Sequence, residues 1–260
     1  MKLLVFDLDD TLLNRQKCIG PKTLKALRAW QSNGGVLVLA TSRPSRAVRR
    51  FVNPDLLKNA YLITLNGAVY GSIGESQITQ VLGDAARTII EQSPFRKVVY
   101  FSIEFRGEEF ACNRQMTVEE LAHYHSATPD MQLPLAAISY QDVVKVAIDG
   151  LGQSLMDQVE WISSLNLKVI PALDGTFLNV VHPSVDKSTT LQLMLDKWHH
   201  TPDDVVAFGD DLPDLGLFHF AGTRVAMANA VPELKQQADV VIGDCDDDCI
   251  GEYVEQYCYD

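Results

Sequence analysis

Aspartate residues cluster at two points of the sequence, each directly after a short apolar run. The first cluster, Asp7-Leu8-Asp9-Asp10-Thr11, follows the run KLLVF at residues 2–6. In an extended segment the side chains of residues i and i+2 share a face, so Asp7 and Asp9 are expected to project together. Two such carboxylates repel each other, and a hard divalent ion such as Mg²⁺ would let both stay ionised. An acidic turn that caps a helix is the alternative interpretation.

The second cluster, GDDLPD at residues 209–214, also follows an apolar run. Asp210 is expected at the carboxyl end of its strand, and Asp214 lies one helical turn later. Pro213 is tolerated only in the first turn of a helix, so a helix is predicted to begin here. The alternative is that these acids only interact favourably with the helix dipole.

Two further strand ends carry groups suited to an anion. Thr41-Ser42-Arg43-Pro44 closes the second apolar run, and hydroxyls with exposed N–H groups at such a junction can bind phosphate. Lys187 begins a predicted helix, where the helix dipole disfavours a cation. The alternatives are a simple N-cap at Thr41 or Ser42 and a solvated surface lysine. Together, the four strand ends predict a site that binds a cation and an anion at once.

These residues lie in a chain of alternating strand and helix patterns. Buried strands are expected at residues 2–6, 36–40, 61–65, 204–209, 224–227 and 239–242. Helices are expected from Pro21 to the Gly34-Gly35 stop and at residues 188–198, 212–220 and 231–237. This alternation predicts an α/β fold with a doubly wound parallel sheet. Such sheets place their ligands at the carboxyl ends of the strands.

The stretch from residue 83 to residue 181 has a different pattern. Its strands alternate more and lie further apart: 98–103, 109–113, 143–148, 168–171 and 176–180, with helices at 117–124 and 152–165. We therefore expect a smaller α+β domain at residues 83–181, inserted into a Rossmann-like core of residues 1–82 and 182–260.

The composition of the chain limits the kinds of partner that the protein is expected to bind. The chain has 260 residues, 47% of them hydrophobic, and a net charge of −12. This charge repels nucleic acid and anionic membranes, so neither is expected as a partner. No apolar run approaches the ~18 residues of a membrane span, and the early aspartates do not fit a signal peptide. Five scattered cysteines fit free thiols in a cytoplasmic protein. The oligomeric state cannot be inferred.

The motifs resemble those of the haloacid dehalogenase superfamily of phosphohydrolases. DLDDT, ATSRP, a single lysine before a helix, and GDDLPD occur in that family's order and spacing. Asn66-Gly67-Ala68, the segment 225–230 and Ala238-Asp239 resemble its Cof-type branch. The matches cover residues 1–70 and 182 to the C-terminus. The middle region resembles the family's type IIB (C2B) cap only in its position along the chain.

The resemblance implies a Mg²⁺-dependent phosphomonoester hydrolase that acts on a small phosphorylated metabolite such as a sugar phosphate. Asp7 would be the nucleophile that forms an aspartyl-phosphate, and Asp9 the general acid and base. Thr41 and Lys187 would bind the phosphoryl oxygens and complete the catalytic set. The implied phosphate-binding residues are Thr41, Ser42, Arg43, Asn66 and Lys187. The implied metal residues are Asp7, Asp9 through its main-chain carbonyl, Asp210 and Asp214, with Asp214 or Asp211 holding metal-bound waters.

Three residues depart from the family pattern: Asp10 and Ser42 each replace a glycine, and Pro213 replaces an asparagine. Pro213 and Ser42 leave open a non-catalytic protein that binds a phosphorylated ligand. Clustered aspartates with a Thr or Ser and a Lys also occur in phosphoacceptor signalling domains, and a phosphomutase of the same superfamily is a further alternative. Two weaker features are interpreted as structural. Cys245 and Cys249 are expected in an exposed acidic tail rather than a soft-metal site, and His123 and His125 are expected on the surface.

Overall fold

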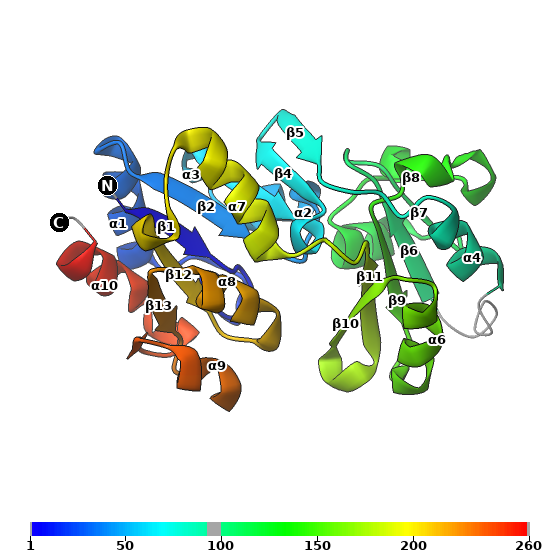
Figure 1. Ribbon diagram of the computed structural model, residues 1–260. Coiled ribbons are helices and arrows are strands. Elements are labelled where there is room, and N and C mark those ends of the chain that lie inside the picture. Colours follow the sequence, from blue (N-terminus) through cyan, green and yellow to red (C-terminus); the bar gives the residue numbers. More distant parts are fainter. Residues whose placement is uncertain (1, 93–99, 259–260) are drawn as a thin grey trace. The chain divides into compact units, whose positions relative to one another are not determined.

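The computed structural model describes residues 2–92 and 100–258, which form two compact units (Figure 1). Unit 1 comprises residues 1–42, 48–76 and 186–260, and unit 2 comprises residues 43–47 and 77–185. The chain therefore passes into unit 2 twice, at residues 43–47 and at residues 77–185, and returns to unit 1 each time. The assignment of these units as a catalytic core and an inserted cap stays a prediction.

Unit 1 contains the larger sheet, whose strand order is β14-β13-β12-β1-β2-β3-β4-β5. The strands are β1 (Leu3–Phe6), β2 (Val36–Ala40), β3 (Ala60–Thr64), β4 (Val69–Ser72), β5 (Glu75–Ile78), β12 (Val205–Gly209), β13 (Thr223–Ala226) and β14 (Val240–Val241). Six of them, from β14 to β3, run parallel, and β4 is antiparallel to β3. Every residue of β1 and β12 is buried, which explains why both sequences are continuous apolar runs.

Helices cover both faces of this sheet, so the predicted doubly wound α/β fold is confirmed. The helices of unit 1 are α1 (Pro21–Ser32), α3 (Pro54–Leu57), α7 (Lys187–Trp198), α8 (Leu215–Phe220), α9 (Pro232–Gln237) and α10 (Ile250–Tyr257), while α2 (Ser45–Phe51) begins in unit 2. Phe6 and Phe208 stack in the layer that α1 and α10 cover, with ring centroids 4.3 Å apart. Leu3 and Val5 pack on the opposite side against α7 and α8.

Unit 2 has a six-stranded sheet in the order β10-β11-β9-β6-β7-β8, mostly antiparallel. Its elements are β6 (Tyr100–Glu104), β7 (Phe110–Cys112), β8 (Gln132–Leu133), β9 (Lys145–Asp149), β10 (Lys168–Ala172), β11 (Phe177–Val181), α4 (Asp84–Gln92), α5 (Val118–Glu120) and α6 (Val159–Ser164). Helices α4 and α6 pack on one face of the sheet. The helix expected at 152–165 is shorter, because Leu151 and Gly152 adopt left-handed conformations that end the preceding turn. Residues 98 and 99 of the first expected strand lie outside the described residues.

The prediction of a surface position for His125 is wrong. Its ring stacks on Phe110 at 4.4 Å, and its Nε2 lies 2.5 Å from the Tyr100 hydroxyl. Burial lowers the pKa of His125 to about 4.

The Arg46 guanidinium donates to both oxygens of the buried Glu104 at 2.8 Å, and Arg46 Nε donates to the His125 carbonyl. These contacts explain why residues 43–47 belong to unit 2 although both flanking segments belong to unit 1.

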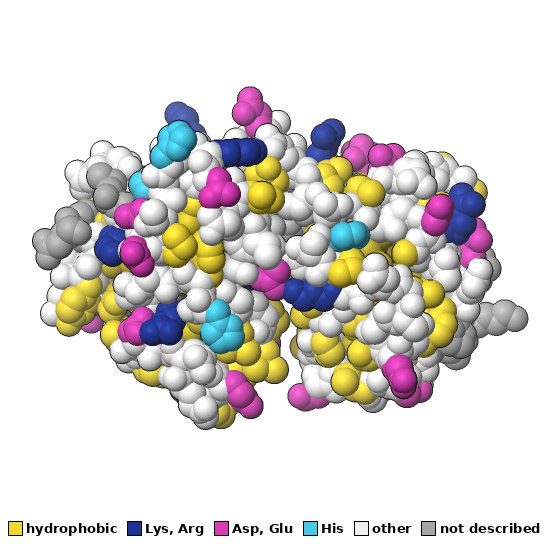
Figure 2. Space-filling view, viewed as in Figure 1, with side chains coloured by type: hydrophobic (Ala, Val, Ile, Leu, Met, Phe, Trp, Pro, Cys, Tyr) yellow, Lys and Arg dark blue, Asp and Glu magenta, His cyan; other side chains and the backbone are white. Residues whose placement is uncertain are grey.

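Charged side chains are dispersed over the face of the molecule drawn in Figure 2, with Lys and Arg interspersed among Asp and Glu. Among the described helices, none combines the length and the apolar character that crossing a bilayer requires.

Candidate active site

The carboxyl ends of adjacent strands bring the predicted residues of unit 1 to one edge of the sheet. Phe6 in β1 pairs with Phe208 in β12 and with Leu39 in β2, so the residues that follow these strands lie side by side (Figure 1). The Asp7 N–H extends the ladder by donating to the Phe208 carbonyl at 3.0 Å. Asp7, Asp210 and Thr41 therefore occupy neighbouring strand ends, as the sequence predicts.

Lys187 is the cation of this cluster, and the alternative of a solvated surface lysine is wrong. Its Nζ donates to Asp7 Oδ1 at 2.6 Å and to Asp214 Oδ1 at 2.7 Å. Only 4% of the residue is exposed. Burial by itself lowers the pKa of Lys187, but attraction to Asp214 and Asp7 outweighs it and raises the pKa above its ordinary value. The lysine consequently stays charged.

Asp214 is positioned by the short helix η9 (Leu212–Asp214). Asp211 caps this helix through its side chain, which accepts from the Leu212 N–H at 2.8 Å. Asp214 Oδ2 accepts from the N–H groups of Asp210 and Asp211 at 3.2 and 3.3 Å. A Cβ at Gly209 would lie only 2.8 Å from the Asp214 side chain, so only glycine fits there. The GDDLPD motif thus folds so that Asp214 faces Lys187.

The cluster carries more negative than positive charge. Oxygens of Asp7, Asp210 and Asp214 all lie within 4.8 Å of one another, and Lys187 is the ammonium that binds two of these residues. Burial, together with repulsion from Asp214 and Asp210, raises the pKa of Asp7 well above its ordinary value despite Lys187. Burial is also the main cause that raises the pKa of Asp210 to about 7, while a 2.6 Å hydrogen bond from the Thr11 hydroxyl opposes this rise.

This donor set fits a divalent cation. All three side chains offer carboxylate oxygens, which Mg²⁺ and similar hard ions prefer. Three carboxylates and one ammonium leave two negative charges when all are ionised, and a divalent ion would balance them. Burial is the largest cause of the raised pKa values of Asp7 and Asp210, and repulsion among the neighbouring acids adds to it.

Asp9 has a partner that the sequence reasoning missed. Lys17 Nζ lies 3.0 Å from Asp9 Oδ1 and 3.5 Å from Asp10 Oδ1. Thr11, the donor to Asp210, was also not assigned a role, although it belongs to the DLDDT motif. The position of Lys17 depends on a left-handed turn in the loop between Asp9 and Lys17. The spacing of these two residues in the sequence therefore does not predict their contact.

Thr41 and Asn66 lie together at the ends of β2 and β3. Both are buried, and the Asn66 N–H donates to the Thr41 carbonyl at 3.1 Å. Asn66 is left-handed, with φ of 64°, and the following Gly67 carbonyl accepts from Thr190 of α7 at 2.7 Å. Ser42 and Arg43 follow Thr41 directly, Arg43 as the first residue of unit 2. The phosphate contacts expected of these four residues stay predictions.

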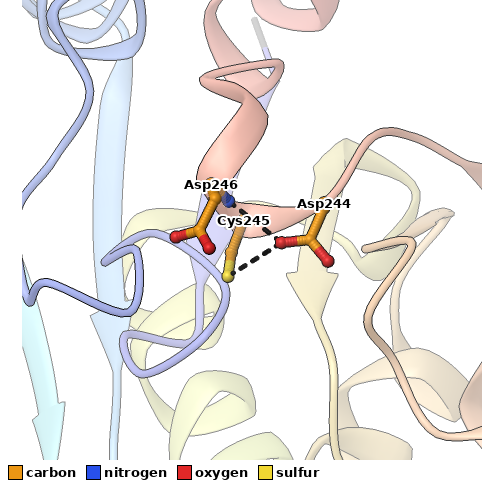
Figure 3. Close-up of side chains that lie close together, drawn as sticks. All are labelled: Asp244, Cys245 and Asp246. Carbon is orange, nitrogen blue, oxygen red and sulfur yellow. Dashed lines mark hydrogen bonds between the residues drawn. The ribbon is translucent and has the colours of Figure 1, made fainter.

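A second acidic group, Asp244-Cys245-Asp246, is explained by structure rather than by a metal. Figure 3 shows Asp244 accepting from the Asp246 N–H at 3.1 Å and from the Cys245 thiol at 3.5 Å. Arg15 binds both carboxylates, at 2.7 and 2.5 Å, and so offsets one of their two negative charges. The prediction of an exposed tail is wrong, because Cys245 and Cys258 are buried and α10 packs against α1.

The chain is similar to known proteins in sequence and in fold. The profile of haloacid dehalogenase-like hydrolases matches residues 4–254, so the chain belongs to that family. It is 26% identical to an HMP-PP phosphatase of Yersinia enterocolitica, over 98% of this chain and 95% of that one. It is 23% identical to a 5-amino-6-(5-phospho-D-ribitylamino)uracil phosphatase of Bacillus subtilis, over 98% of both chains. A solved structure described as an HAD subclass IIB sugar phosphatase shares the fold, with a TM-score of 0.78, 18% identity and 99% coverage of both chains. The expected family and the HAD-type phosphatase class are confirmed.

Proposed function

We propose that this protein is a Mg²⁺-dependent phosphomonoester hydrolase that works through an aspartyl-phosphate. The observation that carries the proposal is the buried cluster in which Lys187 binds Asp7 and Asp214 beside Asp210. A lysine held against one carboxylate of an acidic cluster can stabilise the charge of a phosphoryl group at the carboxylate that attacks it.

The reaction takes place in two displacements. Asp7 attacks phosphorus through one carboxylate oxygen, the bond from phosphorus to the ester oxygen breaks, and Asp9 donates a proton to the departing alcohol. Asp9, now a carboxylate, removes a proton from water, whose oxygen attacks the phosphorus of the aspartyl-phosphate. The acyl phosphate bond breaks, Asp7 is regenerated and inorganic phosphate leaves. The proton taken from water restores the acid form of Asp9.

Two side chains stabilise the transferring group. The Lys187 ammonium and the Thr41 hydroxyl bind phosphoryl oxygens, over which the negative charge of the transition state is spread. Mg²⁺, held by Asp7, the Asp9 main-chain carbonyl and Asp210, would offset repulsion between the anionic nucleophile and the anionic substrate. Asp214 holds Lys187 in place. We propose that Asp214 also belongs to the metal site.

We further propose that the substrate is a small phosphorylated metabolite such as a sugar phosphate. The relatives named above act, by their descriptions, on a phosphorylated ribityl compound, on HMP-PP and on sugar phosphates. The net charge of −12 disfavours polyanionic substrates such as nucleic acid. Unit 2 takes the role of a cap that selects the leaving group.

Phosphate release from a panel of phosphorylated metabolites, with and without Mg²⁺, tests the proposal. We expect turnover that requires a divalent ion and is lost in Asp7→Asn, whose amide is not a nucleophile. Acid quench during turnover, followed by mass spectrometry, should find one phosphoryl group on the peptide that contains Asp7. Activity that persists in Asp7→Asn, or phosphate transfer to an added sugar in place of water, would contradict a hydrolase with this nucleophile.

A further inference from the structure

Lys17 lies on a loop that follows the DLDDT motif, and the loop fixes its conformation. Asn14 closes the loop: its N–H donates to the Cys18 carbonyl at 3.0 Å, and its carbonyl accepts from the Lys17 N–H at 2.8 Å. The Asn14 side chain accepts from the N–H groups of Gln16 and Cys18. Within this frame Lys17 is left-handed, with φ of 59°, a conformation that a non-glycine residue adopts only when its surroundings impose it.

The loop is also tied to the C-terminal part of the chain. The Arg15 side chain binds Asp244 and Asp246, and the Arg15 N–H donates to Asp246 at 3.0 Å. The Asp10 carbonyl accepts from the Asn229 side chain at 2.7 Å. Residues on both sides of Lys17 therefore have fixed positions, and the ammonium is presented to Asp9 from a rigid frame.

Asp10 takes part in the same arrangement. Its φ of 58° is a conformation that glycine, the residue this family uses there, adopts without strain. Aspartate tolerates it better than most residues and adds a carboxylate, which lies 3.5 Å from Lys17 Nζ. Lys17 thus links the side chains of Asp9 and Asp10, two neighbouring carboxylates that otherwise repel each other.

We propose that Lys17 is a positioning residue for Asp9, the general acid and base of the proposed reaction. The Asp9 side chain is 31% exposed, so packing alone does not fix its rotamer. Lys17 binds its Oδ1 at 3.0 Å and so fixes the orientation of the carboxyl group that is proposed to exchange a proton with the leaving group and with water. It also offsets the repulsion between the neighbouring carboxylates of Asp9 and Asp10. This inference rests on the proposed function and adds to it a residue outside the family motifs.

Kinetics of Lys17→Met, Lys17→Gly and Lys17→Arg test the inference. Glycine adopts the left-handed turn without strain but lacks the ammonium, so it separates charge from backbone conformation. We expect Lys17→Met and Lys17→Gly to lower kcat/KM about tenfold for alkyl phosphates, whose leaving groups need protonation, and less for p-nitrophenyl phosphate. Lys17→Arg should recover most of the loss. The inhibition constant of inorganic phosphate should not change, because Lys17 does not bind the phosphoryl group.

Lys22→Met is the matched control, because Lys22 pairs with Glu252 on the surface of the same unit and does not contact Asp9. Equal losses for both kinds of leaving group, or weaker phosphate inhibition in Lys17→Met, would overturn the positioning role. An unchanged kcat/KM in Lys17→Gly would overturn it as well, even if Lys17→Met were unstable. Failure of the wild-type protein to hydrolyse any phosphomonoester would instead show that the proposed function itself is wrong.

Discussion

Lys187 and Asp7 form a buried ion pair. We expect removal of the lysine and removal of the aspartate to change the stability of the fold in opposite directions. Lys187 binds two carboxylates and is the cation between them, whereas Asp7 is one of three acids that share a small volume. Removing the cation leaves buried negative charge uncompensated, while removing one acid relieves repulsion. The close approach of these acids therefore leaves this buried region with uncompensated negative charge in the absence of a metal.

We expect Asp7→Asn to abolish turnover without lowering the melting temperature. The amide is nearly the size of the carboxylate but cannot form an acyl phosphate, and its neutrality reduces repulsion with Asp210 and Asp214. Phosphate release and thermal melting without Mg²⁺ measure the two effects. Asp203→Asn, at an exposed position, is the control for the substitution itself. A fall in melting temperature confined to Asp7→Asn would show that the charge of Asp7 stabilises the fold.

Lys187→Met should have the opposite effect on stability. Removing one partner from a buried ion pair leaves unpaired charge and costs about 3–5 kcal/mol of unfolding free energy. Urea denaturation at neutral pH measures this loss, and the double variant Lys187→Met with Asp7→Asn should recover part of it. A loss no larger in Lys187→Met than in the exposed control Lys22→Met would mean that the ion pairs do not stabilise the fold.

At the scale of elements, helix η9 and the strand before it place Asp210 and Asp214 together. Asp211 caps η9, Pro213 occupies its first turn and Asp214 accepts two main-chain N–H groups. The replacement of the family's asparagine by Pro213 is thus accommodated as a rigid helix start. The two acids nearest the motif residues have their own partners: Asp10 lies 3.5 Å from Lys17 Nζ, and Asp211 accepts from the Leu212 N–H.

We expect Asp211→Ala to lower stability by about 1 kcal/mol, the ordinary cost of a lost helix cap. Because η9 orients Asp214, and Asp214 holds Lys187, which is proposed to bind the phosphoryl group, kcat should also fall and inhibition by phosphate should weaken. Asp203→Ala, in the turn before β12, is the control for removal of an acidic side chain. Chemical denaturation and steady-state kinetics check both parts, and wild-type stability and kcat in Asp211→Ala would show that the cap is dispensable.

Local sequence rules account for the elements that carry the site. Continuous apolar runs identify β1, β2 and β12, and strand order brings Asp7, Thr41 and Asp210 together. The rules fail where position depends on contacts between distant segments. His125 follows polar neighbours in sequence, yet Phe110 and Tyr100 enclose it. Cys245 lies in an acidic stretch, yet Arg15 pairs with Asp244 and Asp246 and α10 packs on α1. Lys17 reaches Asp9 only because Asn14 imposes a left-handed turn.

At the scale of the whole molecule, the net charge of −12 makes the protein repel the anionic substrates proposed for it. Attraction must therefore be local, and under the proposed function it would come from the buried Lys187 and from the divalent cation that the acidic cluster fits. The same cluster should control how the stability of the protein depends on pH and on Mg²⁺.

We expect Mg²⁺ to raise the melting temperature, and to do so more as pH rises. Burial raises the pKa of Asp210 from its ordinary 3.8 to about 7, so between these values the folded protein binds more protons than the unfolded chain. The contribution of Asp210 to the unfolding free energy of the metal-free protein therefore falls as pH rises from about 4 to about 7, whereas the contribution of His125, whose pKa burial lowers to about 4, rises over the same range. Mg²⁺ binds the ionised cluster and adds stability by mass action, little at pH 5 and fully at pH 8. Melting curves at both pH values, with Asp210→Asn as the control, measure this. An equal Mg²⁺ effect at pH 5 and pH 8, or one retained in Asp210→Asn, would place the metal elsewhere.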